Sequence, residues 1–218
     1  LKAVNEGNWS VAEFVDTPAT AIPTDVKPLM ILQYMDSKGL NPYQDYTTLP
    51  SQYGSSFYVN NYTGNLVYAY NDVSMPGTRS KITVSHYYNS ADSRNQNVAN
   101  EDFPAASAGH TARYGTGFRL NLNQHLYDVT ISGTKYVVHT DADGTRNYFA
   151  PTSDSNRWEY EFDTKTYIVR DAAGDYTIHY EDGSRLLFSG STRRLSKLID
   201  SDENALTVVY GASSDTYY

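Results

Sequence analysis

The chain has 218 residues, a formal net charge of −8 at pH 7, no cysteine, and 21 tyrosines against 7 phenylalanines. The negative charge argues against nucleic acid or an anionic membrane surface as the main partner, because both require clustered cations. The absence of cysteine excludes a disulfide framework and a thiolate-bound metal. No apolar run reaches the 18 residues that indicate a membrane-spanning helix.

The first 36 residues differ in character from the rest, and we predict that they form the tail of an upstream β-module or an N-terminal arm. Residues 9–15 predict a short strand, and residues 28–34 form an apolar run that predicts a buried strand. An isolated strand is not stable, so residues 28–34 pair either with the rest of this chain or with a preceding module. Because the chain begins Leu-Lys-Ala, we expect it to be a fragment of a longer protein whose targeting signal lies elsewhere.

Residues 37–56 are polar and rich in turn formers, and they predict a Tyr-rich linker. Residues 57–218 predict a β-meander, because short alternating segments are separated by turn residues. Residues 89–114 lack periodicity and predict a long loop that is either mobile or functional. No segment has a 3.6-residue period over three turns, so we expect little helix.

A short pattern returns four times between residues 135 and 210: an acidic turn, an alternating strand, then an aromatic residue. The copies begin at Asp141, Asp171, Glu181 and Asp202. Asp-Gly between alternating segments is a strong hairpin signal, since tight hairpin turns need a positive φ that Gly tolerates. We therefore predict an all-β fold, an antiparallel meander of successive hairpins.

Several motifs, in a specific order, resemble RHS/YD-repeat wall-associated proteins of Gram-positive bacteria, at the N-terminal segment of the repeat region. They are the Gly-Asn-Leu at residues 64–66, the turn at 71–77, the Tyr-Asn-Ser at 88–90, the segments 114–121 and 140–149, and the region 194–210. Phe118 stands where that family usually has Trp. Arg193 and Ala205 replace two turn glycines, so we expect those turns to be looser. The hairpin pattern and the resemblance assign turn or structural roles to Gly64, Asn65, Pro76, Gly77, Asn89, Gly117, Asp141, Asp143, Gly144, Gly174, Gly183 and Asn204.

The resemblance covers roughly residues 28–210 and implies a large secreted or cell-wall-associated protein whose repeats form a β-shell. In toxin-carrying relatives the shell encloses a C-terminal toxic domain. This segment would be a non-enzymatic scaffold at the start of the shell, and its partners would be the downstream repeats of the same chain. The self-cleavage of relatives depends on Asp-Pro motifs; this chain contains none, so autoproteolysis is not carried over.

The residue patterns do not assign a catalytic residue, a cofactor or a metal. The five histidines lack metal-ligand spacing, and we expect them to be cross-strand or loop residues. The pairs Asp141/Asp143 and Asp200/Asp202 suggest calcium, but neither loop has the Gly and Glu positions of an EF-hand. We interpret both as hairpin turns, and a weak calcium site of another kind stays open.

Two other function classes stay open. The alternative is a carbohydrate-binding or adhesive surface module for cell-wall or host glycans, with Trp9, Trp158 and Tyr160 as candidates for stacking on sugar rings. The third is a glycoside hydrolase, which requires two carboxylates at a defined separation across a cleft. Its candidate carboxylates are Glu159, Glu161, Asp163, Asp171 and Asp182. Glu159 and Glu161 alternate with aromatic residues, however, and this pattern is typical of an ordinary amphipathic strand.

Overall fold

The computed structural model divides into two units, Leu1–Ser37 and Lys38–Tyr218. It describes residues 2–6, 9–13, 38–51, 54–75, 82–91, 117–160 and 162–210. The described part of the first unit is one antiparallel hairpin, β1 (Lys2–Glu6) and β2 (Trp9–Glu13). The predicted strand at residues 28–34, the turn residues Pro76 and Gly77 and most of the predicted loop at 89–114 lie outside the described residues.

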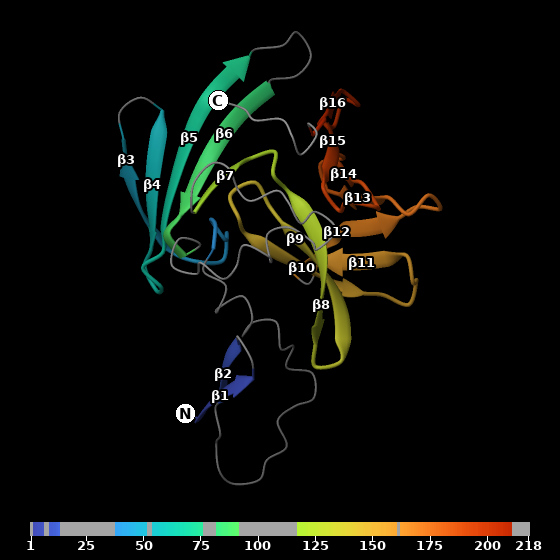
Figure 1. Ribbon diagram of the computed structural model, residues 1–218, viewed down its shortest axis with the longest axis horizontal. Helices are drawn as coiled ribbons and strands as arrows, with labels where there is room; N and C mark the ends of the chain where they lie inside the picture. Colours follow the sequence, from blue (N-terminus) through green and yellow to red (C-terminus); the bar gives the residue numbers. More distant parts are fainter. Residues whose placement is uncertain are drawn as a thin grey trace. The chain divides into compact units, whose positions relative to one another are not determined.

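The second unit contains two antiparallel sheets in which each strand pairs with the next one along the chain (Figure 1). The five-stranded sheet consists of β3 (Tyr46–Pro50), β4 (Ser55–Asn60), β5 (Leu66–Met75), β6 (Ile82–Asn89) and β7 (Phe118–Leu120). The nine-stranded sheet consists of β8 (His125–Ile131), β9 (Thr134–Thr140), β10 (Arg146–Pro151), β11 (Arg157–Tyr160), β12 (Asp163–Arg170), β13 (Tyr176–His179), β14 (Arg185–Phe188), β15 (Leu195–Ile199) and β16 (Ala205–Thr207). The predicted all-β meander of successive hairpins with little helix is confirmed. In the described part of the chain, no helix has the length and apolarity needed to cross a membrane.

Four hairpins of the nine-stranded sheet share one turn geometry. In each, the first residue's N–H donates to the fifth residue's C=O at 2.8–3.1 Å, and the fourth residue's N–H donates to the first residue's C=O at 3.1 Å. The first residues are Asp141, Asp171, Tyr180 and Asp200. The fourth residues are Gly144, Gly174, Gly183 and Glu203, with φ of +96°, +92°, +86° and +64°. This is the type I turn followed by a left-handed residue that often closes three-residue hairpin loops.

The expectation about the two missing turn glycines is only partly correct. Arg193 does occupy a left-handed position, with φ of +58°, in the turn between β14 and β15. Ala205, in contrast, is the first residue of β16, and Glu203 takes the left-handed position in that turn. The Glu203 turn is not looser, because it keeps the same two backbone hydrogen bonds as the turns that contain glycine.

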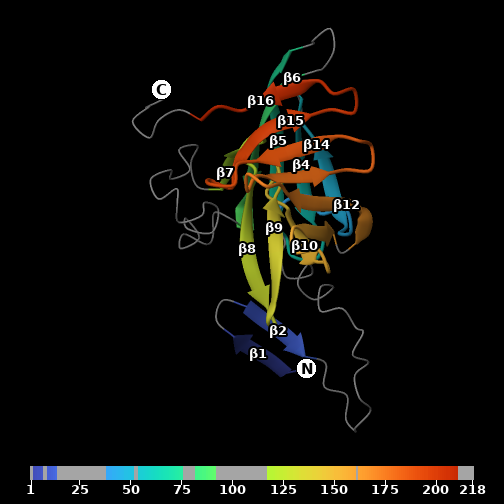
Figure 2. The ribbon, with the colours of Figure 1, turned by 90° about the vertical axis from the view of Figure 1, so that its right-hand side faces the viewer.

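The nine-stranded sheet curls until β15 reaches the start of β8. The backbone N–H of Leu126 donates to the C=O of Arg193 at 2.8 Å, and the N–H of Leu195 donates to the C=O of Gln124 at 3.0 Å. An isolated bridge joins His125 to Arg194 between them. Figure 2 shows the strands succeeding one another around this curl, with β16 following β15. The sheet therefore returns to its own first strand and then continues by one more strand.

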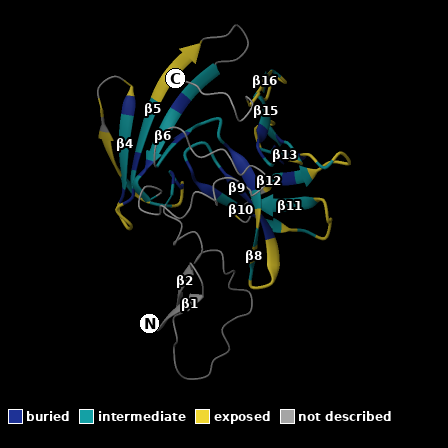
Figure 3. Cartoon of the chain, viewed as in Figure 1, coloured by how far each residue is buried: buried dark blue, intermediate teal, exposed yellow. Residues whose placement is uncertain are grey.

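The concave side of this curl holds the hydrophobic core. Eight buried residues from seven strands form one cluster: Leu126, Val137, Phe149, Ile168, Tyr176, Ile178, Phe188 and Leu195. Because successive side chains of a strand point to opposite faces, the alternating pattern places these residues on one face. In contrast, residues 71–75 at the end of β5 are exposed (Figure 3).

Residues 46–50 differ from the sequence prediction, which placed them in a linker. They form β3, which pairs with β4 along its whole length. The segment Tyr-Thr-Thr-Leu is rich in residues that favour strands. Pro50 ends the strand, and a proline is tolerated there because β3 is at the edge of its sheet.

Candidate functional site

A buried polar junction joins the two sheets, and Asn89 at the end of β6 lies at its centre. The Asn89 side chain is fully buried. Its Oδ1 accepts hydrogen bonds from the backbone N–H of Gly39 (2.8 Å) and from Nδ2 of Asn65 (3.3 Å). Its Nδ2 donates to the backbone C=O of Asp143 (2.6 Å), in the turn between β9 and β10. One amide therefore links three segments that are far apart in the sequence.

Three glycines permit the close approach of these segments. A Cβ on Gly39 would lie 2.1 Å from Oγ1 of Thr145, and a Cβ on Gly117 would lie 2.9 Å from the backbone oxygen of Asn89. A Cβ on Gly144 would lie 3.0 Å from Nδ2 of Asn89. All three glycines have a positive φ, so both the backbone conformation and the available space favour glycine.

Asp143 connects this junction to residues 38–43, which we call the strap. Its Oδ2 accepts a hydrogen bond from the backbone N–H of Leu40 (2.9 Å), and its Oδ1 accepts one from the N–H of Thr145 (2.9 Å). Oγ1 of Thr145 also accepts from the N–H of Leu40 (3.0 Å). The strap is thus fixed across the turn between β9 and β10.

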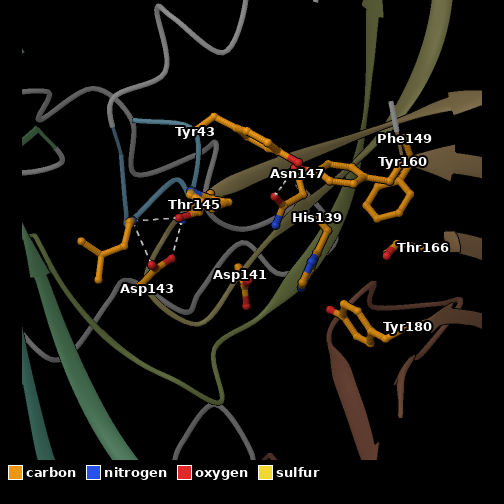
Figure 4. A pocket seen from close by; sticks show the side chains of 12 residues that line it. Tyr43, His139, Asp141, Asp143, Thr145, Asn147, Phe149, Tyr160, Thr166 and Tyr180 are labelled. Carbon is orange, nitrogen blue, oxygen red and sulfur yellow. Dashed lines mark hydrogen bonds between the residues drawn. The ribbon is translucent and has the colours of Figure 1, made fainter. Parts of the chain in front are cut away.

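The strap and the strands β9 to β12 enclose a pocket of about 260 Å³. Its described lining residues are Leu40, Pro42, Tyr43, His139, Asp141, Asp143, Thr145, Asn147, Phe149, Tyr160, Thr166 and Tyr180. In Figure 4, Tyr43 and Tyr180 lie on opposite sides, and Asp141, His139 and Asn147 lie between them. The pocket therefore combines aromatic walls with a few polar groups, which is the usual composition of a small-molecule site.

Burial shifts the pKa of three groups in the pocket, His139, Asp143 and Tyr180. It lowers the pKa of His139, whose Nε2 is hydrogen-bonded to Oε1 of Gln124 (2.9 Å), so His139 is neutral at pH 7. Burial, followed by the charge of Asp141, raises the pKa of Asp143. Burial also raises the pKa of Tyr180, whose hydroxyl stays protonated. The pocket therefore contains a neutral imidazole and a protonated phenol beside the carboxyl groups of Asp141 and Asp143.

Of the three residues predicted to stack on sugars, Tyr160 lines the pocket and Trp158 does not. Trp158 packs against the core cluster, with its ring centroid 5.8 Å from that of Tyr176. Trp9 belongs to β2 of the first unit, and its side chain lies outside the described part. Sequence analysis did not assign Asn147, Thr166 or Tyr180, because nothing local in the sequence indicates that β10, β12 and the residue after β13 converge.

The described carboxylates considered for hydrolysis, Glu159, Asp171 and Asp182, do not line the pocket beneath the strap. Glu159 forms an ion pair with Arg157 (3.2 Å). The Asp171 carboxylate accepts a hydrogen bond from the backbone N–H of Asp175 in a hairpin turn. Hydrogen bonds from the hydroxyl and the backbone N–H of Ser184 lower the pKa of Asp182. Glu161 and the side chain of Asp163 lie outside the described residues.

In the acidic turns considered for calcium, Asp141 and Asp200 accept hydrogen bonds within their own turns, whereas Asp143 also accepts one from Leu40 of the strap. Hydrogen bonds from the side chain and backbone of Asn204 lower the pKa of Asp200. Among the described residues, no group of three or more His, Asp or Glu side chains is arranged to hold a metal ion.

The comparison with known families found one match. The profile of a family described as "Domain of unknown function (DUF6531)" matches residues 58–149, which is less than half of the chain. The matched segment contains Asn65, Asn89 and Gly117, together with the turn from Asp141 to Thr145, so most of the polar junction lies within it. No curated protein and no solved structure matches the chain.

Proposed function

We propose that this chain is a non-enzymatic scaffold segment of a large secreted or cell-wall-associated bacterial protein of the RHS/YD-repeat type. In this proposal it forms the first turn of a β-shell that continues into downstream repeats, of the kind that encloses a C-terminal toxic domain in toxin-carrying members of that family. The observation that carries the proposal is the curl of the nine-stranded sheet, which returns to β8 at β15 and then continues with β16.

This arrangement favours a spiral over a closed barrel. A closed barrel would pair its first strand with its last strand along their length. Here the contact between β8 and β15 is one bridge with two flanking hydrogen bonds, and β16 extends past it. Nearby, the Tyr210 hydroxyl donates to the backbone oxygen of Leu122 at 3.2 Å, so the chain after β16 passes the start of the curl.

The repeated turn also supports a scaffold that grows by repetition. Four hairpins of the nine-stranded sheet use the same five-residue turn, and each strand of that sheet pairs with the next one along the chain without a change of sheet. In repeat proteins of this kind, a terminal unit lacks the neighbour that covers its edge and is less stable than an internal unit. Among the described residues, no strand pairs with the outer edge of β16.

Hydrogen exchange tests this proposal by comparing this chain with a longer chain that includes the next repeats of the parent protein. We expect the amides of β15 and β16 to exchange at least about tenfold more slowly in the longer chain, because a new strand covers their edge. The amides of β9 and β10, which lie inside the sheet, should change little and provide the internal reference.

The matched control carries an extension of the same length and composition in shuffled order. The scaffold proposal is wrong if β16 gains no protection from the true extension. It is also wrong if the shuffled extension protects β16 equally, because the effect would then not depend on a repeat sequence.

A further inference from the structure

We propose that the pocket beneath the strap binds one ring of a neutral, hydroxyl-rich sugar. This inference concerns a binding site and does not depend on whether the chain belongs to a larger shell. The pocket of about 260 Å³ lies just below the range of roughly 300–1,000 Å³ that is common for small-molecule sites. Its size suits a single ring with the rest of a glycan outside.

The aromatic walls provide flat apolar surfaces for the C–H face of a sugar ring. Tyr43 has 57% of its surface exposed, yet its ring is stacked on Phe162 with centroids 4.5 Å apart and an interplanar angle of 29°. Phe162 in turn lies 5.5 Å from Tyr160, which packs on the buried Phe149 at 5.4 Å. This chain of rings anchors the exposed Tyr43 to the core, so binding costs little side-chain entropy.

The polar lining supplies both donors and acceptors, as sugar hydroxyls require. Oδ1 of Asn147 accepts a hydrogen bond from the Tyr160 hydroxyl (3.3 Å), which orients the amide so that Nδ2 serves as a donor. Oδ1 of Asp141 accepts the backbone N–H of Ala142 (2.6 Å), and its second oxygen serves as an acceptor. Thr166 adds a hydroxyl on the side of β12.

The charges of the pocket select against anionic sugars. The described lining contains Asp141 and Asp143 but neither lysine nor arginine, and His139 is neutral because it is buried. A uronic or sialic acid would therefore bring its carboxylate close to the Asp141 carboxyl group, with no compensating cation in the described lining.

The same lining fits an ammonium group less well. The two oxygens of Asp143 already accept backbone hydrogen bonds from Thr145 and Leu40, so they are not directed at a ligand. The remaining polar groups of the lining come from several strands and turns, from β9 to the residue after β13. Such a distribution suits several hydroxyls better than one concentrated charge.

Calorimetric titration of the full 218-residue chain tests the proposal. The ligands are glucose, galactose, mannose and N-acetylglucosamine, with glucuronic acid and methylammonium as charged comparisons. We expect at least one neutral sugar to bind and glucuronic acid to bind at least about tenfold more weakly. The variant Tyr43→Ala should weaken binding of that sugar by about tenfold or more, because it removes one wall.

The matched control is Tyr62→Ala, because Tyr62 is 68% exposed and lies outside the pocket, in the turn between β4 and β5. It should leave binding unchanged, and circular dichroism should show both variants folded. The variant Asp141→Asn keeps a hydrogen-bonding side chain and should reduce the discrimination against glucuronic acid. Binding of no neutral sugar, preferred binding of methylammonium or glucuronic acid, or equal losses in Tyr43→Ala and Tyr62→Ala would each overturn the proposal.

Discussion

Gly144 and Gly183 occupy the same position in two hairpin turns that share the same two backbone hydrogen bonds. They differ in how close the neighbouring side chains lie. Their φ angles are +96° and +86°. A Cβ on Gly183 would meet nothing within 4 Å, whereas one on Gly144 would lie 2.7 Å from Nη1 of Arg119 and 3.0 Å from Nδ2 of Asn89. Replacing each by alanine therefore separates backbone strain from disruption of the polar junction.

The expected loss of folding stability is the sum of backbone strain and, at Gly144, disruption of the polar junction. A left-handed φ costs an alanine roughly 1–2 kcal/mol, and this term applies to Gly144→Ala and Gly183→Ala alike. At Gly144 the new methyl group also displaces the buried Asn89 from the Asp143 carbonyl, which adds roughly 1–3 kcal/mol. We therefore expect Gly144→Ala to cost roughly 2–5 kcal/mol and Gly183→Ala roughly 1–2 kcal/mol.

Guanidinium denaturation of the full chain, followed by circular dichroism, measures both free energies of unfolding. The variant Arg119→Ala provides a further control, because it removes the flexible neighbour and leaves Asn89 in place. The extra cost of Gly144→Ala should persist in that background. Equal costs for Gly144→Ala and Gly183→Ala would refute the inference that the junction is tightly packed around Asn89.

Two further predictions concern the nine-stranded sheet. Burial, with a smaller contribution from Arg119, lowers the pKa of His125 from 6.5 to about 3, so below pH 6.5 the unfolded chain binds a proton that the folded chain does not. The contribution of His125 to the free energy of unfolding should therefore be almost fully present at pH 7 and fall by about 2 kcal/mol by pH 5. His125→Gln should reduce the slope of stability against pH in denaturation measured from pH 7 to pH 5, and an unchanged slope would contradict the assignment. The second concerns Glu203, which is in the left-handed region with φ of +64° and forms an exposed ion pair with Arg185. Glu203→Gly should be about 1 kcal/mol more stable to thermal unfolding than Glu203→Gln, since both lose the ion pair and only glycine relieves the backbone, and equal stability would argue against strain at this turn.

The local features of the fold were predictable because they depend on neighbours in the sequence. The strand alternation and the Asp-Gly turns predicted the meander, and glycine's tolerance of positive φ explains why Gly174 and Gly183 lie where the pattern assigns turns. The sequence did not predict the strand β3, because the segment around it is rich in turn formers and its local strand signal is weak. Pairing with β4 nevertheless makes it a strand. Among the pocket residues, Tyr160 was the one predicted to bind sugar. The sequence did not predict that the other lining residues meet there, because they come from segments whose convergence depends on the curl of the sheet.

The sequence by itself determined that the chain is an antiparallel β-meander and that its acidic turns are hairpin turns, and together with the family resemblance it predicted structural roles for Asn65, Asn89, Asp143 and Gly144. Only the tertiary structure decided that these last residues meet in one buried junction, that β15 returns to β8, and that the strap encloses a pocket against β9 to β12. The physical reason is the sequence separation of the residues that interact. Turn conformation and side-chain alternation depend on residues within a few positions of one another. The junction, in contrast, joins positions 50 and 54 residues apart, and their contact depends on how far the whole sheet curls.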